Sequence, residues 1–226
     1  MDTEAFKQQI YAEMAGMTKA LQHPVRLHIL DVLAQGPASV EYLAGQCGHS
    51  IANASAHLQK LKAARLVEME KRGKYSYYRM ANMQVFETLC ALRRLGMSQN
   101  AEINHLIKAY RSERNSLHSM PIQELARRLE QPSGEIVLLD VRPAEEYRQG
   151  HIKNAISIPA DTLRERLHQL PADKPVVAYC RGSFCVMADE AVHLLREQGF
   201  EASRLEQGFP EWAAQKLPVA HSETPV

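Results

Sequence analysis

The chain has 226 residues, of which 45% are hydrophobic, and its 27 Lys and Arg side chains nearly balance 26 Asp and Glu. That length suits two domains of roughly 100 residues, each able to bury its own core. The first residues lack the basic and then apolar pattern of a signal peptide, and no window reaches the apolar length of a membrane span. We therefore expect a soluble, cytoplasmic protein with no membrane partner.

Charge is unequally distributed along the chain. Residues 1–118 hold 15 basic and 10 acidic side chains, whereas residues 119–226 hold 12 and 16. A basic first half is compatible with a polyanionic partner, although a solvated surface explains the same charge. Four cysteines in a chain without an export signal argue against a disulfide scaffold and predict thiols that stay reduced until something reacts with them.

The first half reads as a series of short helices. Apolar residues at helical spacing predict one helix over about 6–17 and a second that opens at His23-Pro24. A short helix over 40–46 and a longer one over about 50–63 then lie on either side of Gly48. Two short helices across a tight turn predict a helix-turn-helix.

The second helix of this motif has an apolar face and a small, polar face. Its apolar stripe consists of Ile51, Ala54, Leu58 and Leu61. The opposite face carries Ala52, Asn53, Ser55, Ala56 and Gln59. Such a face can approach base edges closely, because Asn and Gln pair with adenine and small residues meet the thymine methyl. The segment is therefore either a recognition helix or a plain surface helix.

A hairpin with a basic tip follows that helix. Residues 66–80 alternate apolar and polar side chains on both sides of Arg72-Gly73-Lys74. A charged hairpin directly after a recognition-type helix is typical of a wing that grips phosphate. The candidate phosphate contacts are Lys60, Lys62, Arg65, Lys71, Arg72, Lys74 and Arg79.

Three segments of the first half carry a family resemblance. HPVRLHIL at 23–30, SAHLQKL at 55–61 and ARLV at 64–67 resemble the ArsR family of winged-helix repressors, and the likeness covers about residues 5–110. It implies a homodimer that binds double-stranded DNA at an imperfectly palindromic operator. One apolar stripe supplies either the dimer surface or the domain's own core: Phe86, Leu89, Leu92, Leu95, Ile103, Leu106, Ile107 and Tyr110.

Many ArsR-family proteins sense metals, so we considered the metal-ligating residues. Cys47 has no cysteine two residues away, and Glu102 with His105 is too small a set for a closed zinc site from one chain. We expect no metal and no other cofactor, with a site shared across a dimer as the alternative. Cys47 and Cys90 either form a redox pair or are small buried hydrophobes.

The second half alternates strands and helices. Apolar runs of strand length at 136–141, 155–159 and 176–179, with helical stretches between them, predict a parallel sheet flanked by helices. The predicted fold class is thus a mainly α winged helix-turn-helix followed by an α/β domain. The predicted boundaries are a first domain at 1–111, a polar linker at 112–120, a second domain at 121–218 and a tail at 219–226.

The second domain also resembles a known family. LDVRPAEEYRQGHIKNAISIP at 139–159 and GFPEW at 208–212 resemble the rhodanese family, and the likeness covers about residues 120–217. It implies the rhodanese fold and transfer of sulfane sulfur to a cysteine. Four polar residues either act in catalysis or, as is usual in this family, brace the loops: Asp140, Arg142, Glu146 and His151.

The candidate site of the second domain is the cysteine loop. It consists of Cys180, Arg181, Gly182, Ser183, Phe184 and Cys185, directly after the apolar run at 176–179. An α/β sheet presents reactive groups at that position. Backbone N–H groups, the positive end of the following helix and the charge of Arg181 all favour an anionic sulfur. Cys180 is therefore the predicted sulfur acceptor.

Two positions of the loop depart from related chemistries. Val186 stands six residues after Cys180, where phosphatase chemistry of the Cys-x5-Arg type needs an arginine, which disfavours phosphatase and arsenate reductase activity. Many rhodaneses also have an arginine here, so thiosulfate should bind weakly. Cys185 either attacks a persulfide on Cys180 to form a disulfide or is a buried thiol at the start of a helix.

These features predict a DNA-binding transcriptional regulator, most simply a repressor, that senses sulfane sulfur through persulfidation of Cys180. Its partners are then operator DNA, a sulfane-sulfur donor and a second copy of the chain. One alternative is a thiosulfate or polysulfide sulfurtransferase with an accessory winged helix. The other is an ArsR-type metal or arsenite sensor with an inert rhodanese module.

Overall fold

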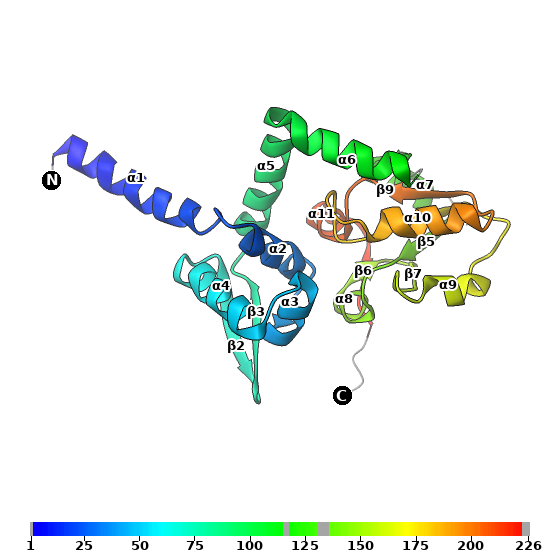
Figure 1. Ribbon diagram of the computed structural model, residues 1–226, viewed down its shortest axis with the longest axis horizontal. Helices are drawn as coiled ribbons and strands as arrows, with labels where there is room; N and C mark the ends of the chain where they lie inside the picture. Colours follow the sequence, from blue (N-terminus) through cyan, green and yellow to red (C-terminus); the bar gives the residue numbers. More distant parts are fainter. Residues whose placement is uncertain (1, 115–117, 131–135, 223–226) are drawn as a thin grey trace. The chain divides into compact units, whose positions relative to one another are not determined.

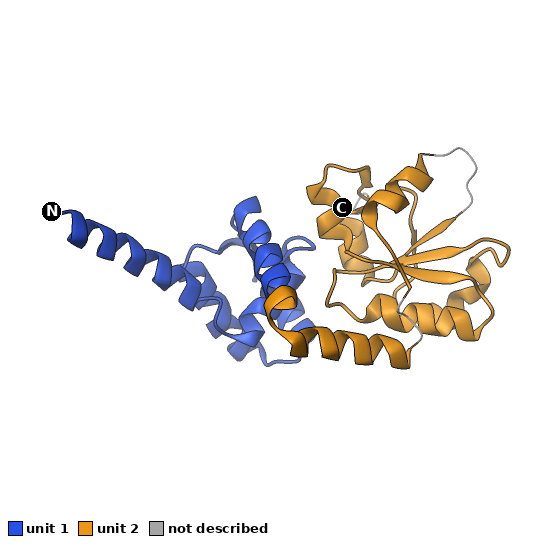
Figure 2. Ribbon diagram, turned by 90° about the horizontal axis from the view of Figure 1, so that it is seen from above, with its two compact units in different colours: residues 1–95 blue, residues 96–226 orange. Residues whose placement is uncertain are grey.

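The computed structural model describes residues 2–114, 118–130 and 136–222, and the chain divides into two compact units, residues 1–95 and 96–226 (Figures 1 and 2). Each unit has its own hydrophobic core. The two predicted fold classes, a mainly α helix-turn-helix and an α/β domain with a parallel sheet, are confirmed.

Two helices begin the first unit. Helix α1 (Thr3–Lys19) starts at Asp2, whose side chain accepts the N–H of Ala5, and no residue of α1 is buried. Helix α2 (Pro24–Leu33) has proline at its first position. Proline lacks a backbone N–H, and this costs nothing there because an N–H at the first position has no partner within the helix. Ile29 and Leu30 of α2 are fully buried and place this helix at the centre of the unit's core.

The predicted helix-turn-helix consists of α3 (Val40–Cys47) and α4 (Ile51–Ala63). Gly48 between them has a φ of 68°, in the left-handed region that favours glycine. Ala54, Leu58 and Leu61 are fully buried, as the apolar stripe predicted. Ile51 is a correction to that stripe, because it is 53% exposed at the first position of α4, before the turns that pack on α2 and α3.

A small antiparallel sheet follows α4. Strands β2 (Val67–Arg72) and β3 (Tyr75–Met80) form the predicted hairpin, and the short strand β1 (Ala38–Ser39) pairs with the other side of β3. Helix α5 (Met83–Gln99) comes next and buries Val85, Phe86 and Leu89, while Leu92 and Leu95 are exposed.

The second unit contains a five-stranded sheet in the order β4-β9-β8-β5-β7, with every neighbouring pair parallel. Its strands are β4 (Ser119–Met120), β5 (Val137–Asp140), β7 (Ile156–Ser157), β8 (Val176–Tyr179) and β9 (Ala202–Leu205). The sequence predicted β5, β7 and β8 but neither β4 nor β9. Residues of β5 and β8 contribute alternately to two apolar clusters, so both faces of the sheet are covered.

Helices and a second strand pair surround that sheet (Figure 1). The helices are α6 (Ala101–Glu113), α7 (Ile122–Leu129), α8 (Ala144–Gln149), α9 (Leu163–Arg166), α10 (Met187–Glu197) and α11 (Phe209–Ala214), with a 3-10 turn at Leu167–Gln169. Strand β6 (His151–Ile152) pairs antiparallel with β10 (Val219–Ala220).

The compact units differ from the predicted boundaries in three ways. Helix α6, predicted within the first domain, belongs to the second unit. Strand β4 lies within the predicted linker, and β10 lies within the predicted tail, because backbone pairing with β9 and β6 holds both segments. Residues 115–117 of the predicted linker and 223–226 of the tail lie outside the described residues.

Candidate functional site

The cysteine loop, residues 180–186, connects the carboxyl end of β8 to the start of α10. Strand β8 is the middle strand of the sheet, and Cys180 directly after it is 4% exposed. The Cys180 carbonyl accepts the N–H of Phe209 at 3.1 Å, and the Cys185 N–H donates to the Gly182 carbonyl at 3.0 Å. The loop is thus a hydrogen-bonded turn at the edge where parallel sheets present reactive groups.

A glycine outside the loop allows this packing. A Cβ atom placed on Gly208 would lie 2.3 Å from the Arg181 carbonyl carbon and 2.3 Å from the Gly182 nitrogen. Both are backbone atoms that cannot rotate away. Only glycine therefore lets the segment before α11 press against the cysteine loop.

The charge of Arg181 is used within the fold. Its Nε lies 3.0 and 3.1 Å from the two carboxylate oxygens of Glu146 on α8, and both side chains are buried. The sequence predicted that the charge of Arg181 favours an anionic sulfur; the Glu146 carboxylate balances much of that charge, and the remainder acts to lower the pKa of Cys185. A second buried pair joins Arg142 to Asp140 at 2.6 Å, and the same guanidinium donates to the Gly150 carbonyl. Both pairs brace loops around the sheet edge.

The two loop thiols form a coupled pair. Burial raises the pKa of the Cys180 thiol well above its usual range, and its Sγ donates to the Cys185 carbonyl at 3.6 Å. A hydrogen bond from the Cys180 side chain lowers the pKa of Cys185, and backbone groups of Arg181 and Met187 act in the same direction. Burial thus opposes ionisation of Cys180, the thiol that the sequence expected to be anionic, whereas the hydrogen bonds around Cys185 favour its ionisation.

Helix α6 is hydrogen-bonded to this loop. The Arg111 guanidinium donates to the Ser183 carbonyl at 2.7 Å and to Asp189 on α10 at 3.2 Å. Arg204 of β9 pairs with the same Asp189 carboxylate at 3.3 Å. At the C-cap of α6, Arg114 donates to Glu190 at 2.8 Å. The sequence placed α6 residues in an apolar stripe and missed these polar contacts, which no local pattern marks.

The outer surface of the loop is apolar. Phe184 is 42% exposed and Val186 is 44% exposed, on either side of the half-buried Cys185. Large apolar side chains gain nothing from contact with water. Exposed apolar side chains therefore flank Cys185 in the sequence of the loop.

In the first unit, the candidate base-reading face of α4 is open to solvent. Four of its five predicted residues, Ala52, Asn53, Ala56 and Gln59, are exposed, and Ser55 is half-buried. The Gln59 amide donates to the Tyr78 hydroxyl of β3 at 3.1 Å, so this side chain also ties the helix to the wing. Lys60 and Lys62 are exposed on the last turns of α4.

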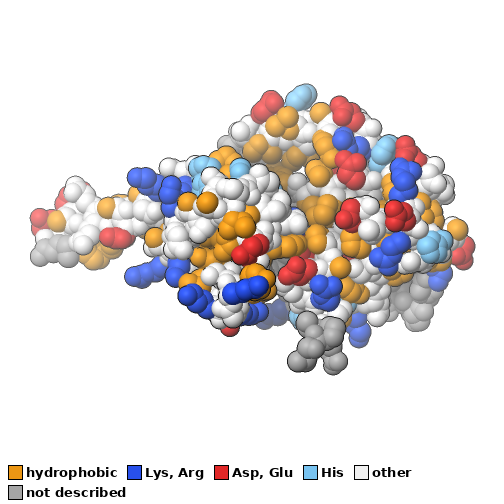
Figure 3. Space-filling model, turned by 60° about the horizontal axis from the view of Figure 1, so that its bottom comes forward, with side chains coloured by type: hydrophobic (Ala, Val, Ile, Leu, Met, Phe, Trp, Pro, Cys, Tyr) orange, Lys and Arg blue, Asp and Glu red, His pale blue; other side chains and the backbone are white. Residues whose placement is uncertain are grey.

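The wing presents its charges around Gly73. Lys71, Arg72 and Lys74 are all exposed. Arg72 pairs with Glu70 at 2.9 Å, and Arg79 forms an ion pair with Glu68 across the hairpin. Glu70 and Glu68 offset the charges of Arg72 and Arg79, although solvent screens both exposed pairs. The lysines therefore carry more of the tip's net charge. Figure 3 shows the Lys and Arg side chains that gather on the winged-helix side of this view.

The remaining cysteines and the potential metal-ligating residues do not form a second candidate site among the described residues. Cys47 and Cys90 are reduced thiols outside any disulfide, each half-buried, and Cys47 packs against the core of the first unit. Within residues 2–114, 118–130 and 136–222, no group of three or more His, Cys, Asp or Glu side chains is arranged to hold a metal ion. Across the same residues, no helix combines the length and apolarity that a membrane crossing requires.

Both units match known protein families. Residues 121–215 match the rhodanese-like domain, and residues 21–70 match a helix-turn-helix domain. The chain is 42% identical over 217 residues to the HTH-type transcriptional regulator Rv0324 of Mycobacterium tuberculosis. The aligned region covers 94% of this chain and 92% of that protein. It is 40% identical over 76 residues to the uncharacterized protein YqhL of Bacillus subtilis, covering 33% of this chain and 59% of YqhL.

Among solved structures, one similar protein is the homodimeric winged helix-turn-helix DNA-binding domain Mb0332 from Mycobacterium bovis, described as a possible ArsR-family transcriptional regulator. It is 35% identical, with a TM-score of 0.41, and the match covers 44% of this chain and 90% of that domain.

Proposed function

This chain belongs to the family of HTH-type transcriptional regulators in which an ArsR-type winged helix precedes a rhodanese-like domain, and we propose that it is a repressor whose DNA affinity changes when the cysteine loop takes up sulfane sulfur. The observation that carries the proposal is the bonding of Arg111 to the Ser183 carbonyl and to Asp189. Only Asn100 separates α6, which holds Arg111, from α5. The loop is thus tied to the helix that continues from the DNA-binding half of the chain.

The first chemical step loads sulfur onto Cys180. Cys180 attacks the outer sulfur of a hydropersulfide, R–S–SH, and its proton moves to the Cys185 thiolate. A new S–S bond forms at Cys180, the S–S bond of the donor breaks, and R–S⁻ leaves with the electron pair. The hydrogen bond between the two side chains gives the proton its path.

The second step uses Cys185 as a resolving thiol. Its sulfur attacks the inner sulfur of the Cys180 persulfide, which forms a Cys180–Cys185 disulfide and releases hydrogen sulfide. A disulfide requires Cα atoms about 4.4–6.8 Å apart, which a turn of five residues can supply. Ser183 lies between the two cysteines in the chain and so belongs to the ring that the disulfide closes. Formation of the disulfide therefore moves the Ser183 carbonyl, to which Arg111 donates.

The energy needed for a response is modest. Loss of the Arg111 contacts with the loop changes the free energy with which α6 packs on the cysteine loop and α10. A coupling free energy of ~1–3 kcal/mol changes operator affinity about 5- to 150-fold. One charged hydrogen bond is of that size, ~1.5–3 kcal/mol.

The surroundings of the loop favour an apolar, organic sulfur donor. Arg181 faces the Glu146 carboxylate, and Arg111 and Arg204 share the Asp189 carboxylate, so two carboxylates offset all but one of the three positive charges that thiosulfate could use. Phe184 and Val186 at the rim offer apolar contact to an alkyl group instead. We therefore propose an alkyl hydropersulfide or organic polysulfide as donor.

The DNA partner is an imperfectly palindromic operator bound by a homodimer. The exposed face of α4, with Asn53 at its N-terminal end, is available to base edges, and the wing lysines to phosphate. Leu92, Leu95 and Leu106 are exposed, and a second copy of the chain would cover them.

The test combines mass spectrometry with operator binding. Full-length protein is treated with an alkyl hydropersulfide, its modification is read by intact mass, and its operator affinity is read by fluorescence anisotropy. We expect a mass gain of one sulfur or a Cys180–Cys185 disulfide, with an affinity change that Cys180→Ser abolishes. The Cys47→Ser/Cys90→Ser double variant is the control and should respond like the wild type. Equal affinities before and after modification would disprove the sensor function, and thiosulfate turnover without such a change would favour the sulfurtransferase.

A further inference from the structure

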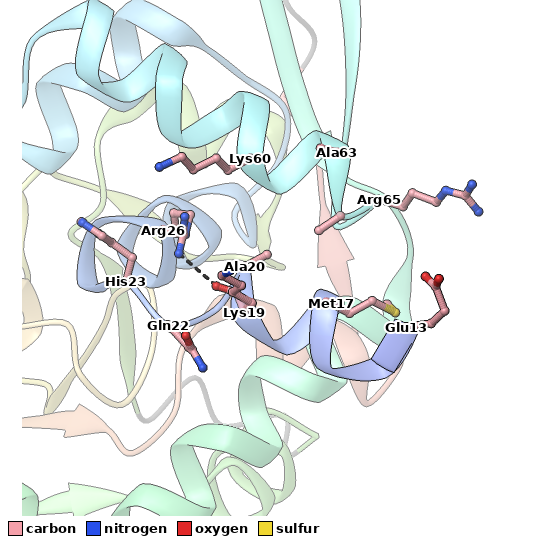
Figure 4. A pocket seen from close by; sticks show the side chains of 12 residues that line it. Glu13, Met17, Lys19, Ala20, Gln22, His23, Arg26, Lys60, Ala63 and Arg65 are labelled. Carbon is pink, nitrogen blue, oxygen red and sulfur yellow. Dashed lines mark hydrogen bonds between the residues drawn. The ribbon is translucent and has the colours of Figure 1, made fainter. Parts of the chain in front are cut away.

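The first unit contains a cavity of about 800 Å³ between the end of α1, the start of α2 and the end of α4 (Figure 4). A cavity of this size is in the range of small-molecule sites, ~300–1,000 Å³. The cysteine loop does not use it, and Lys60 and Arg65 of its lining are the candidate phosphate contacts that it shares with the helix-turn-helix function.

The lining of the cavity is strongly basic. It includes Lys19, His23, Arg26, Lys60 and Arg65, against the single carboxylate of Glu13. In Figure 4 the side chains of His23, Arg26 and Lys60 gather at one end, while Arg65 and Glu13 lie at the other. The pKa of the adjoining His57 is lowered, first by burial and then by the positive charges of His23, Arg26 and Lys60. One end of the cavity is therefore a concentrated positive region.

That end also holds a buried donor without a partner among the described residues, the Nε of Arg26. Arg26 is 8% exposed and its Nη2 donates to the Lys19 carbonyl at 3.1 Å, but its Nε has no partner among the described residues. His23 accepts the Val25 N–H on Nδ1, which leaves Nε2 as a donor. A buried donor without a partner is costly, ~1–3 kcal/mol, so an acceptor from outside the chain would be well bound.

The rest of the lining is apolar. Met17, Ala20, Ala63 and Ala64 contribute their side chains between the two ends. A ligand that matches both parts has a compact oxyanion head and an apolar body. We propose that this cavity binds an organic anion, with a phosphate- or carboxylate-type head held by His23, Arg26 and Lys60 and its apolar body along Met17, Ala20, Ala63 and Ala64.

The place of the cavity on α4 favours a free small molecule over a DNA phosphate. Recognition helices contact bases with their N-terminal residues. Lys60 lies seven residues beyond Asn53, which is about 10 Å along a helix. The ligand thus occupies the C-terminal end of α4, about two helical turns from Asn53, where it can adjust the packing of α4 on α1 and α2.

Phenyl phosphate, which has both a head and a body, is the probe for this site. Isothermal titration of the full-length protein should show saturable binding of phenyl phosphate, weaker binding of inorganic phosphate and none of phenol. Lys60→Gln should weaken phenyl phosphate binding about tenfold, since it removes a charged hydrogen bond, and Lys60→Arg should retain most of it. Lys62→Gln is the matched control, because Lys62 is an exposed lysine on the same helix outside the cavity, and it should leave binding unchanged.

Histidine NMR and operator DNA supply the remaining readouts. Bound phenyl phosphate should raise the pKa of His57, because the anion offsets the positive charges that lower it. Absence of saturable binding, or equal weakening by Lys60→Gln and Lys62→Gln, overturns the proposal. Stoichiometric displacement of phenyl phosphate by operator DNA, with a salt slope reduced by about 1 in Lys60→Gln, assigns the site to a DNA phosphate and overturns it as well.

Discussion

Replacement of Arg111 by Gln should uncouple the cysteine loop from α6. The Arg111 side chain is 13% exposed and donates to the Ser183 carbonyl and to the nearly buried carboxylate of Asp189. Glutamine cannot span both acceptors and carries no charge. Asp189 keeps its ion pair with Arg204, so the substitution does not leave a buried charge unpaired.

The magnitude follows from these contacts. A hydrogen bond to a charged group contributes ~1.5–3 kcal/mol, and the remaining Arg204 pair places the expected loss near the lower end, at ~2 kcal/mol. That loss corresponds to a change of about 30-fold in the equilibrium for docking of α6. Arg114→Gln, at the residue that caps the C-terminus of α6, is the matched control. Its pair with Glu190 is 26% and 48% exposed and is screened by solvent, so its loss should affect the docking of α6 far less.

Hydrogen exchange and operator binding measure the two consequences. The amides of α6 should exchange about 30-fold faster in Arg111→Gln than in the wild type, and much less so in Arg114→Gln. The affinity change that an alkyl hydropersulfide causes in the wild type should largely disappear in Arg111→Gln, although its cysteines are still modified by intact mass. A variant that responds to the donor like the wild type would refute the role given to Arg111.

Three further outcomes are expected. Lys74→Gln should lower the slope of log K against log salt for operator binding by about 0.9, and an unchanged slope would remove Lys74 from the phosphate contacts. Gly208→Ala should destabilise the second unit by ~1–3 kcal/mol, read as a lower melting temperature, because its Cβ meets the Arg181 backbone; an unchanged melting temperature would contradict that packing. Iodoacetamide should label Cys185 before Cys180 as pH rises, because the lowered pKa gives Cys185 its thiolate at lower pH; peptide mass spectrometry that finds Cys180 labelled first would reverse the assignment.

Local patterns were sufficient for most of the fold. The helix-turn-helix and the wing follow from periodicity and from Gly48 and Gly73, since each element is defined within a few residues of sequence. The position of Ile51 in the apolar stripe was wrong because a helical pattern does not tell which turns are packed. Strands β4 and β9 were missed because β4 has only two residues and β9, Ala202–Leu205, includes a buried arginine that interrupts the apolar run.

The candidate site was predictable only in part. Cys180, Cys185 and the loop between them could be found from the sequence because a strand, a loop and a helix follow one another there. The bond from Arg111 to Asp189 joins residues 78 positions apart, and nothing in the local sequence indicates it. The difference in pKa between the two thiols could not be predicted from the sequence either. Burial raises the pKa of Cys180, and burial depends on how the surrounding residues pack.

The central claim is that sulfur on the cysteine loop controls DNA affinity, and one reversible titration tests it most directly. Operator affinity of the full-length protein is followed by anisotropy in a single sample, first reduced, then with an alkyl hydropersulfide, and finally with excess dithiothreitol. The account predicts an affinity change of about 5- to 150-fold that the reductant reverses and that Cys180→Ser does not show. A constant affinity throughout, with the modification of Cys180 verified by mass, would contradict it.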